Sequence, residues 1–284
     1  MIKEWIEQYR PQSKEEADQA LREIMQEIAL AGLQRSRFFE VAAFYGGTAL
    51  RIFHGLDRFS EDLDFSLLKV EPDFSLKPYL DGMIREFEAL GMKISVTEKE
   101  KTKQSNVDSA FLKPDTAWQE LTLKEIIPQE RMTKIPPAIT IKLEIDKKPP
   151  PGFETEERLL IKPFSFYTKC YTLPDLFAGK MHALLFRKWG NRVKGRDWYD
   201  MEWYIKKSVP LHLDHLAKRA QDSSAWASDK MTQEEFLKLL SGKIESVSME
   251  SVIRDVQPFI KDSSKLDIWS PQYFHDLTRL IKFK

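Results

Sequence analysis

The chain has 284 residues, enough for one large domain or two ordinary ones at ~150 residues per domain. Apolar residues make up 42% of it, with 18 Phe and 7 Trp, so a sizeable core can form and intrinsic disorder is not expected. Basic and acidic residues both number 44, so the formal net charge is zero; a globally basic nucleic-acid-binding protein is not indicated, and any such surface must be local.

Strands and helices are mixed in the first part of the sequence. Ser13 and Glu16 form a capping-box pattern ahead of apolar residues at helical spacing, which predicts a helix over 14–32. An apolar run predicts a buried strand over 38–45 that ends at Gly46. The following patterns predict, in order, a helix over 48–56, a strand over 61–68, a helix over 75–90 and strands over 92–98 and 107–114.

The segment 138–148 has the clearest strand pattern, because alternate positions from Ile139 to Ile145 are apolar. The sequence after residue 172 is helical in pattern. Thr172 and Asp175 suggest a second capping box, at the start of a helix that stops at Gly190. Further helices are predicted over 196–207, 211–221, 232–241 and 273–282. This order predicts an α/β or α+β core over 1–170 and a helical domain over 171–284.

The single cysteine and the termini indicate the compartment. Cys170 has no second cysteine with which to form an intrachain disulfide or a cysteine-cluster metal site. The charged N-terminus does not resemble a signal peptide, and no apolar run approaches the ~20 residues of a membrane span. We therefore expect a cytoplasmic protein without membrane partners.

Gly46 and Gly47 stand where a strand should pass into a helix. A backbone without Cβ atoms can take positive φ and lets a ligand approach closely. A helix that begins near Thr48 would direct N–H groups and the positive end of its dipole at that point. These features favour an anion site, to which the Thr48 hydroxyl adds a donor. A tight turn without a ligand would also explain the glycines, and the spacing matches neither a P-loop nor a dinucleotide fingerprint.

Asp62 and Asp64 flank Leu63, and residues i and i+2 of a strand project from the same face. Two carboxylates held this close repel each other unless a cation lies between them. Mg²⁺ is commonly bound through one or two carboxylates together with substrate phosphates. The pair therefore favours one or two Mg²⁺ ions that carry a nucleotide; the alternative is a solvated strand edge that bears acids.

A two-metal site needs a third acid. Glu144 is the first candidate, because it lies mid-strand on the polar face between Lys142 and Asp146. Asp146 is the alternative third acid. An exposed sheet face with alternating charges would explain the same pattern without any site.

The helical part carries a second group of charged residues. Lys180 lies beside an apolar stripe, where it can present a point charge to phosphate or simply extend into solvent. Asp197 and Asp200 share a helix face, although acids are also favoured in a first helical turn. A basic run around Trp189 can hold an RNA backbone or form a solvated face; it comprises Arg187, Lys188, Arg192, Lys194 and Arg196. The five histidines show no metal-binding spacing and are expected to lie on the surface or to pack.

Two ordered motifs resemble a known family. "GGTAL…R.SEDLDF" within residues 44–68 and "KMHALLFRKWGNRVKGRDWYDMEWYI" over 180–205 resemble the polymerase-β-like nucleotidyltransferase superfamily. More narrowly, they resemble the AbiEii/MenT-type toxins of type IV-like toxin–antitoxin and abortive-infection systems. The resemblance implies an α+β fold, with a mixed-sheet nucleotidyltransferase core and a helical C-terminal domain that contributes to the active cleft.

The resemblance also implies roles for individual residues. By motif position, the nucleotide-binding residues would be Gly46, Gly47, Thr48, Ser60 and Lys180. The catalytic set would be Asp62, Asp64, Lys180, Asp197 and Glu144, with Asp62 and Asp64 as the metal ligands. Glu144, Asp146 and Asp197 are all left as candidates for the third acid. Glu144 stands where the family has a lysine followed by an acid, but its spacing from Lys142 is tighter than the family pattern.

The first functional hypothesis is Mg²⁺-dependent transfer of a nucleoside monophosphate from an NTP to an RNA, as implied by relatives that modify the 3′ end of tRNA and block translation. Transfer to a protein hydroxyl is the second hypothesis. The third is an NTP-binding interaction protein without chemistry, although the retention of both aspartates and Lys180 argues against it. The family also implies a cognate antitoxin partner.

Overall fold

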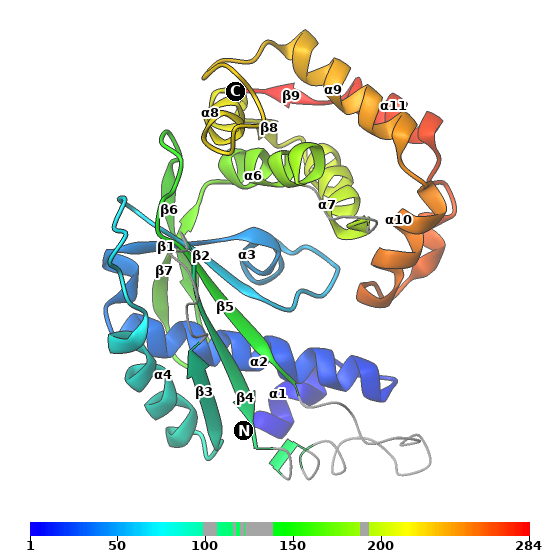
Figure 1. Cartoon of the computed structure of the whole chain (residues 1–284). Coiled ribbons are helices and arrows are strands. Elements are labelled where there is room, and N and C mark those ends of the chain that lie inside the picture. The colour runs from blue at the N-terminus through cyan, green and yellow to red at the C-terminus, as the bar shows by residue number, and fades with distance from the viewer. Residues whose placement is uncertain (99–106, 116–117, 120–121, 123–138, 188–192) are drawn as a thin grey trace. The chain divides into compact units, whose positions relative to one another are not determined.

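The structure is a computed structural model that describes residues 1–98, 107–115, 118–119, 122, 139–187 and 193–284 (Figure 1). It divides into two compact units. Unit 1 comprises Met1–Ala49, Phe59–Pro149 and Glu157–Cys170, and unit 2 comprises Leu50–Arg58, Pro150–Glu156 and Tyr171–Lys284. Among the described residues, no helix is both long and apolar enough to cross a membrane.

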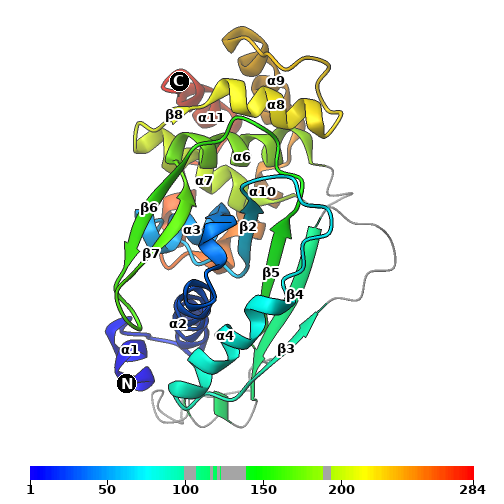
Figure 2. The ribbon, with the colours of Figure 1, turned by 90° about the vertical axis from the view of Figure 1, so that its left-hand side faces the viewer.

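A seven-stranded mixed sheet lies at the centre of unit 1, in the order β3-β4-β5-β2-β1-β7-β6 (Figure 2). The strands are β1 Ala42–Tyr45, β2 Leu63–Leu67, β3 Ile94–Glu98, β4 Val107–Pro114, β5 Ile141–Asp146, β6 Thr155–Leu160 and β7 Phe166–Tyr171. Strand β2 is parallel to β5 and antiparallel to β1, and β1 is parallel to β7. The predicted mixed sheet is therefore confirmed, whereas β6 and β7 were not predicted.

The period-2 pattern of β5 is explained by its place inside the sheet. Ile141, Leu143 and Ile145 are fully buried, while the residues between them are partly exposed. The apolar face of β5 therefore belongs to the core, and the opposite face carries Lys142 and Glu144.

The helices of unit 1 are α1 Ile2–Gln8, α2 Lys14–Arg35, α3 Gly46–His54, which continues into unit 2, and α4 Lys77–Ala89. The Ser13 side chain accepts a hydrogen bond from the Glu16 N–H at 3.2 Å, which confirms the first half of the predicted capping box of α2. The second half differs, because the Glu16 side chain accepts the Gln12 N–H at 2.9 Å. Helices α2 and α4 pack side by side (Figure 2). Their close approach requires glycine, because a Cβ on Gly32 would lie 2.4 Å from the Met83 Cα.

The strand predicted over 38–45 is wrong in its first half. Phe38–Glu40 forms a 3₁₀ helix after Arg37, which takes a left-handed conformation with φ 61°. The Phe38 ring then packs edge-on against Phe65, with ring centroids 5.0 Å apart. Tertiary packing of the aromatic rings therefore replaces the extended backbone that the apolar run suggested, and β1 begins only at Ala42.

Unit 2 is mainly helical, as predicted. Its elements are α6 Leu173–Phe186, α7 Gly195–Lys206, α8 Leu213–Asp222, α9 Gln233–Ser246, α10 Met249–Val256, α11 Pro271–Thr278 and the short parallel pair β8 Pro210–Leu211 and β9 Lys282–Phe283. Helix α6 packs against α7 and α8, α10 packs against α7, and α9 packs against α11 (Figure 1). Helix α10 had no counterpart among the predicted elements.

The second capping box is wrong, although Thr172 is the N-cap of α6. The Thr172 hydroxyl donates to Asp175 Oδ2 at 2.6 Å instead of accepting a backbone N–H. The buried Asp175 carboxylate also accepts hydrogen bonds from the Glu154 N–H at 3.0 Å and from His212 Nδ1 at 2.6 Å. Helix α6 ends at Phe186 rather than at Gly190, and residues 188–192 lie outside the described part of the chain.

Candidate functional site

Asp64 lies on β2, the central strand of the sheet. Its register partners are Tyr45 on antiparallel β1 and Glu144 on parallel β5. Side chains of residues that pair in register project from the same face, and neighbouring strands lie about 4.8 Å apart. Asp64 and Glu144 are therefore neighbours on one face, and both are partly exposed. The sheet brings together two acids that are 80 positions apart in the sequence.

Gly46 follows β1 directly and lies against Asp64. Its φ is +84°, a region that residues with a Cβ atom rarely adopt. A Cβ built on Gly46 would lie 2.6 Å from Asp64 Oδ2. Gly46 therefore meets two independent requirements, a left-handed turn and space for the Asp64 carboxylate. The sequence indicated the first requirement but not the second.

Helix α3 begins at Gly46, two residues earlier than predicted. Its first-turn N–H groups have no carbonyl partner within the helix, which is the feature that makes a helix start attract anions. Thr48 is fully buried, and its hydroxyl donates to the Asp62 carbonyl at 2.5 Å. In this structure Thr48 therefore holds the Asp62 backbone, and its binding to a phosphate stays a prediction.

Asp62 precedes β2, which begins at Leu63, so the prediction that both aspartates lie within the strand is wrong. A buried glutamine fixes the segment before Asp62. Gln26 Nε2 on α2 donates to the carbonyl oxygens of Ser60 and Glu61, at 3.2 and 3.0 Å. The backbone that presents Asp62 is thus anchored to α2 on one side and to Thr48 on the other. Ser60 contributes a carbonyl to this anchor, and its role with a nucleotide stays a prediction.

Glu144 has a cation beside it on the same strand. Lys142 Nζ lies 2.5 Å from Glu144 Oε1, and both side chains are about one third exposed, at 32% and 34%. Asp146 lies one step further along β5, pairs in register with Ser66, and accepts the Lys148 N–H at 2.9 Å. Of the two candidate third acids on β5, only Glu144 is the register partner of Asp64.

Asp64, Glu144 and Asp62 offer carboxylate oxygens, which are the ligands that Mg²⁺ prefers. Among the described residues, no group of three or more His, Cys, Asp or Glu side chains is arranged to hold a metal ion by itself. A Mg²⁺ ion that arrives with a nucleotide needs only one or two carboxylates, because phosphates and waters supply the other ligands. The donor set therefore fits a metal shared with a substrate better than a permanently bound structural metal.

Unit 2 contains a separate cluster of buried charges around Lys180 on α6. Lys180 Nζ lies 2.7 Å from Asp197 Oδ1 and 2.8 Å from Asp200 Oδ2, both on α7. The Lys180 side chain is only 15% exposed, so the alternative of a lysine extended into solvent is wrong. Burial alone would lower the pKa of Lys180, but the two carboxylates outweigh it and raise that pKa.

Arg58 completes this cluster and was not singled out from the sequence. Its Nε and Nη2 atoms donate to the two oxygens of Asp200, each at 2.6 Å, and both side chains are almost fully buried. Burial would raise the pKa of Asp200, but Arg58 and Lys180 lower it below its ordinary value. A signal was present, because Arg58 is the arginine of the first motif. The sequence could not show that Asp200 is the partner of Arg58, because the two residues are 142 positions apart.

The basic run is described only in part. Residues 188–192, including Lys188, Trp189 and Arg192, lie outside the described residues. The Arg196 guanidinium lies 4.2 Å from the centre of the Phe259 ring, so it packs against an aromatic face. Arg187 and Lys194 line a pocket that is considered below.

Comparisons with known proteins identify a family and similar solved structures. The model of the family described as "Nucleotidyl transferase AbiEii toxin, Type IV TA system" matches residues 28–278. The crystal structure of JHP933 from Helicobacter pylori has a TM-score of 0.50 and 18% identity, with 90% of this chain and 91% of that chain covered. A second H. pylori protein, described as a candidate nucleotidyltransferase, has a TM-score of 0.47 and 19% identity, with 90% and 94% covered. No curated protein matches this chain significantly.

Proposed function

The chain belongs to the AbiEii nucleotidyltransferase toxin family of type IV toxin–antitoxin systems, and on this premise we propose that it transfers a nucleoside monophosphate from an NTP to the 3′ end of an RNA, with tRNA as the acceptor and blocked translation as the result. Family membership makes the chain a nucleotidyltransferase toxin and implies a cognate antitoxin. The acceptor, the dependence on Mg²⁺ and the effect on translation are the proposal.

One observation carries the proposal. Gly46, at the start of α3, lies so close to Asp64 that a Cβ would meet its carboxylate, and Glu144 is the register partner of Asp64. A helix start that attracts phosphates thus lies beside acids that attract the metal ions bound to phosphates. An NTP with Mg²⁺ combines both chemistries in one ligand.

The proposed reaction joins the acceptor 3′ oxygen to the α-phosphorus of the NTP. The bond between that phosphorus and the oxygen bridging to the β-phosphate breaks, pyrophosphate leaves, and the hydroxyl proton passes to a base. Mg²⁺ held by Asp62 and Asp64 would supply charge neutralisation at the phosphates. Glu144 is the proposed third acid, in preference to Asp146, because it is the in-register neighbour of Asp64.

The test measures the transfer of label from α-labelled NTPs to tRNA, to other RNA and to protein fractions offered separately. We expect label in tRNA, none after EDTA removes divalent cations, and a loss of at least about 100-fold in Asp64→Asn, because several kcal/mol of charge stabilisation are removed. Asp73→Asn is the matched control, since Asp73 is an exposed aspartate outside the site.

Three outcomes would contradict this proposal. A wild-type rate in Asp64→Asn would remove the site from the chemistry. Label that enters only the protein fraction would move the acceptor to a protein hydroxyl, and NTP binding without any release of pyrophosphate would leave an interaction protein.

A further inference from the structure

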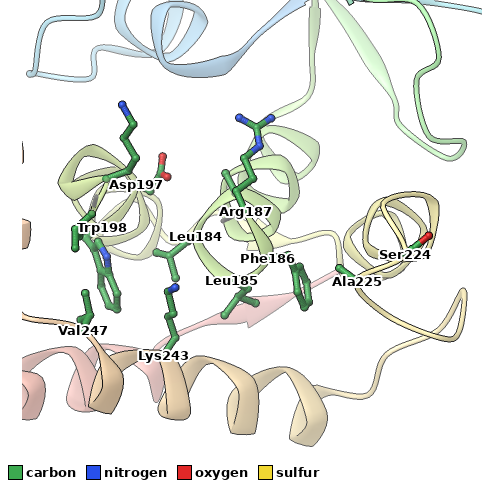
Figure 3. Close-up of a pocket in the computed structure, with 13 residues that line it drawn as sticks. Leu184, Leu185, Phe186, Arg187, Asp197, Trp198, Ser224, Ala225, Lys243 and Val247 are labelled. Carbon is green, nitrogen blue, oxygen red and sulfur yellow. The ribbon is translucent and has the colours of Figure 1, made fainter. Parts of the chain in front are cut away.

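A pocket of about 690 Å³ lies within unit 2 (Figure 3). The end of α6, the start of α7, the turn after α8 and the last turn of α9 form its wall. This volume falls in the range of about 300–1,000 Å³ that is usual for small-molecule sites. None of the residues predicted to bind the nucleotide lines it, whereas Asp197 of the predicted catalytic set does.

The pocket carries an excess of positive charge. Arg187, Lys194 and Lys243 line it, and Asp197 is the one acid among its described lining residues. The Asp197 carboxylate is bonded to Lys180 at 2.7 Å, and Arg187 and Lys194 have interactions of their own. Lys243 is therefore the cation of the pocket that can attract an anionic ligand.

Lys243 is the residue of the pocket at which an anionic group would bind. It belongs to α9, is half-buried, and is directed toward Leu184 (Figure 3). Within the part of the chain that the structure describes, no acid forms an ion pair with it. A lysine in such a place loses part of its hydration without gaining a counter-ion, and a phosphate group would supply one.

The rest of the wall is apolar and partly aromatic. Leu184, Phe186, Trp198 and Val247 contribute to it. Trp198 is held rigidly, because its ring packs edge-on against Phe274 with centroids 5.0 Å apart. Phe186 is partly exposed and can offer a ring face to a planar group. A ligand that matches the whole pocket has a phosphate at one end and a flat apolar group at the other.

We propose that this pocket binds one nucleoside monophosphate unit, with the phosphate at Lys243 and the base against the Phe186 wall. The same chemistry is offered by a free nucleotide and by the terminal nucleotide of a single-stranded RNA. The inference goes beyond the transfer reaction, because it rests on unit 2 residues outside the triphosphate turn and needs neither metal nor chemistry.

The experiment measures binding to the full-length protein without NTP, so that no transfer occurs. The probes are the four nucleoside monophosphates, inorganic phosphate, a labelled single-stranded RNA, and the same RNA with its end paired in a duplex. Lys243→Glu is the test variant, and Lys238→Glu is its matched control, because Lys238 is an exposed lysine of the same helix that does not line the pocket. Melting temperatures establish that both variants fold.

We expect Lys243→Glu to weaken binding of the nucleotide probes about tenfold. The slope of log affinity against log salt concentration should fall by about one or more, because a phosphate contact is lost. Lys238→Glu should bind like the wild type. Phe186→Leu should weaken nucleotide binding but leave inorganic phosphate binding unchanged, because it removes only a stacking face. Preference for the unpaired RNA end identifies the acceptor as the source, and equal binding of free nucleotide identifies a small ligand.

Equal affinity in Lys243→Glu and the wild type would overturn the proposal, and so would an equal loss in Lys238→Glu, which would indicate general electrostatics. If Lys243→Glu does not fold, Phe186→Leu decides in its place, and unchanged nucleotide binding there overturns the proposal. These failures are separate from failure of the transfer reaction, because Asp64→Asn tests that reaction in unit 1.

Discussion

Replacing Gly46 by alanine tests the geometry on which the transfer reaction depends. The added Cβ would lie 2.6 Å from Asp64 Oδ2, a distance that real Cβ contacts essentially never show, so the carboxylate must retreat by a few tenths of an ångström or more. Alanine would also have to hold a φ of +84°, which costs about 1–2 kcal/mol. Gly46→Ala should therefore lose both stability and activity.

Gly91→Ala separates the two effects. Gly91 has φ +75°, almost the same backbone strain, but a Cβ there would meet nothing within 4 Å. Both variants should lose about 1–2 kcal/mol of unfolding free energy. Only Gly46→Ala should lose label transfer, by about 10- to 100-fold, because a misplacement of ~1 Å at a reacting centre can cost that much.

Denaturant unfolding and initial transfer rates, measured on the same preparations, give both quantities. A wild-type rate in Gly46→Ala would refute the argument that this glycine makes room for Asp64 in the chemistry. An equal loss of activity in Gly91→Ala would also refute it, because the loss would then follow from strain alone.

The remaining predictions concern stability. Asp200→Asn should cost about 3–5 kcal/mol of unfolding free energy, because Arg58 and Lys180 lose a shared buried counter-ion. Denaturant unfolding should show a smaller loss for Asp197→Asn. Equal losses in the two variants would contradict the central role of Asp200 in the cluster. Burial and the neighbouring Glu23 raise the pKa of Glu27 from 4.5 to about 7, so its ionised form destabilises the fold above pH 7. Glu27→Gln should raise the unfolding free energy at pH 8 by on the order of 2–3 kcal/mol, with the gain lost as pH falls toward 4.5, and a pH-independent difference would contradict this.

Local sequence patterns predicted the elements in which buried and exposed positions repeat regularly along the whole length. Residues 141–146 alternate between core and surface, so their period of two gave β5 correctly. Phe38 and Phe39 do not follow that logic, because their rings pack in an aromatic cluster behind a left-handed Arg37. Thr172 and Asp175 have capping-box spacing, yet their side chains bond to each other. The Asp175 carboxylate also accepts hydrogen bonds from the Glu154 N–H and from His212 Nδ1, which lie outside the local sequence pattern.

Some features of the candidate site could likewise be predicted from the sequence, and others could not. The glycines and aspartates of 46–64 could be found from the sequence, because a turn and an acid pair are local signals. The proximity of Asp64 and Glu144 could not be predicted, because it depends on β2 pairing with β5, and no local pattern shows which strands pair. Arg58 and Asp200 each lay inside a recognised motif, but only the fold shows that each is the other's bidentate partner.

The buried cluster of unit 2 limits what Lys180 can do. Two cations, Arg58 and Lys180, meet two carboxylates, so the cluster is neutral as it stands. Because the pKa of Lys180 is raised, its amine stays protonated throughout the physiological pH range and cannot accept the proton of an attacking hydroxyl. Asp197 is bonded to that ammonium at 2.7 Å. We propose Glu144 of unit 1 as the base, because it pairs in register with Asp64.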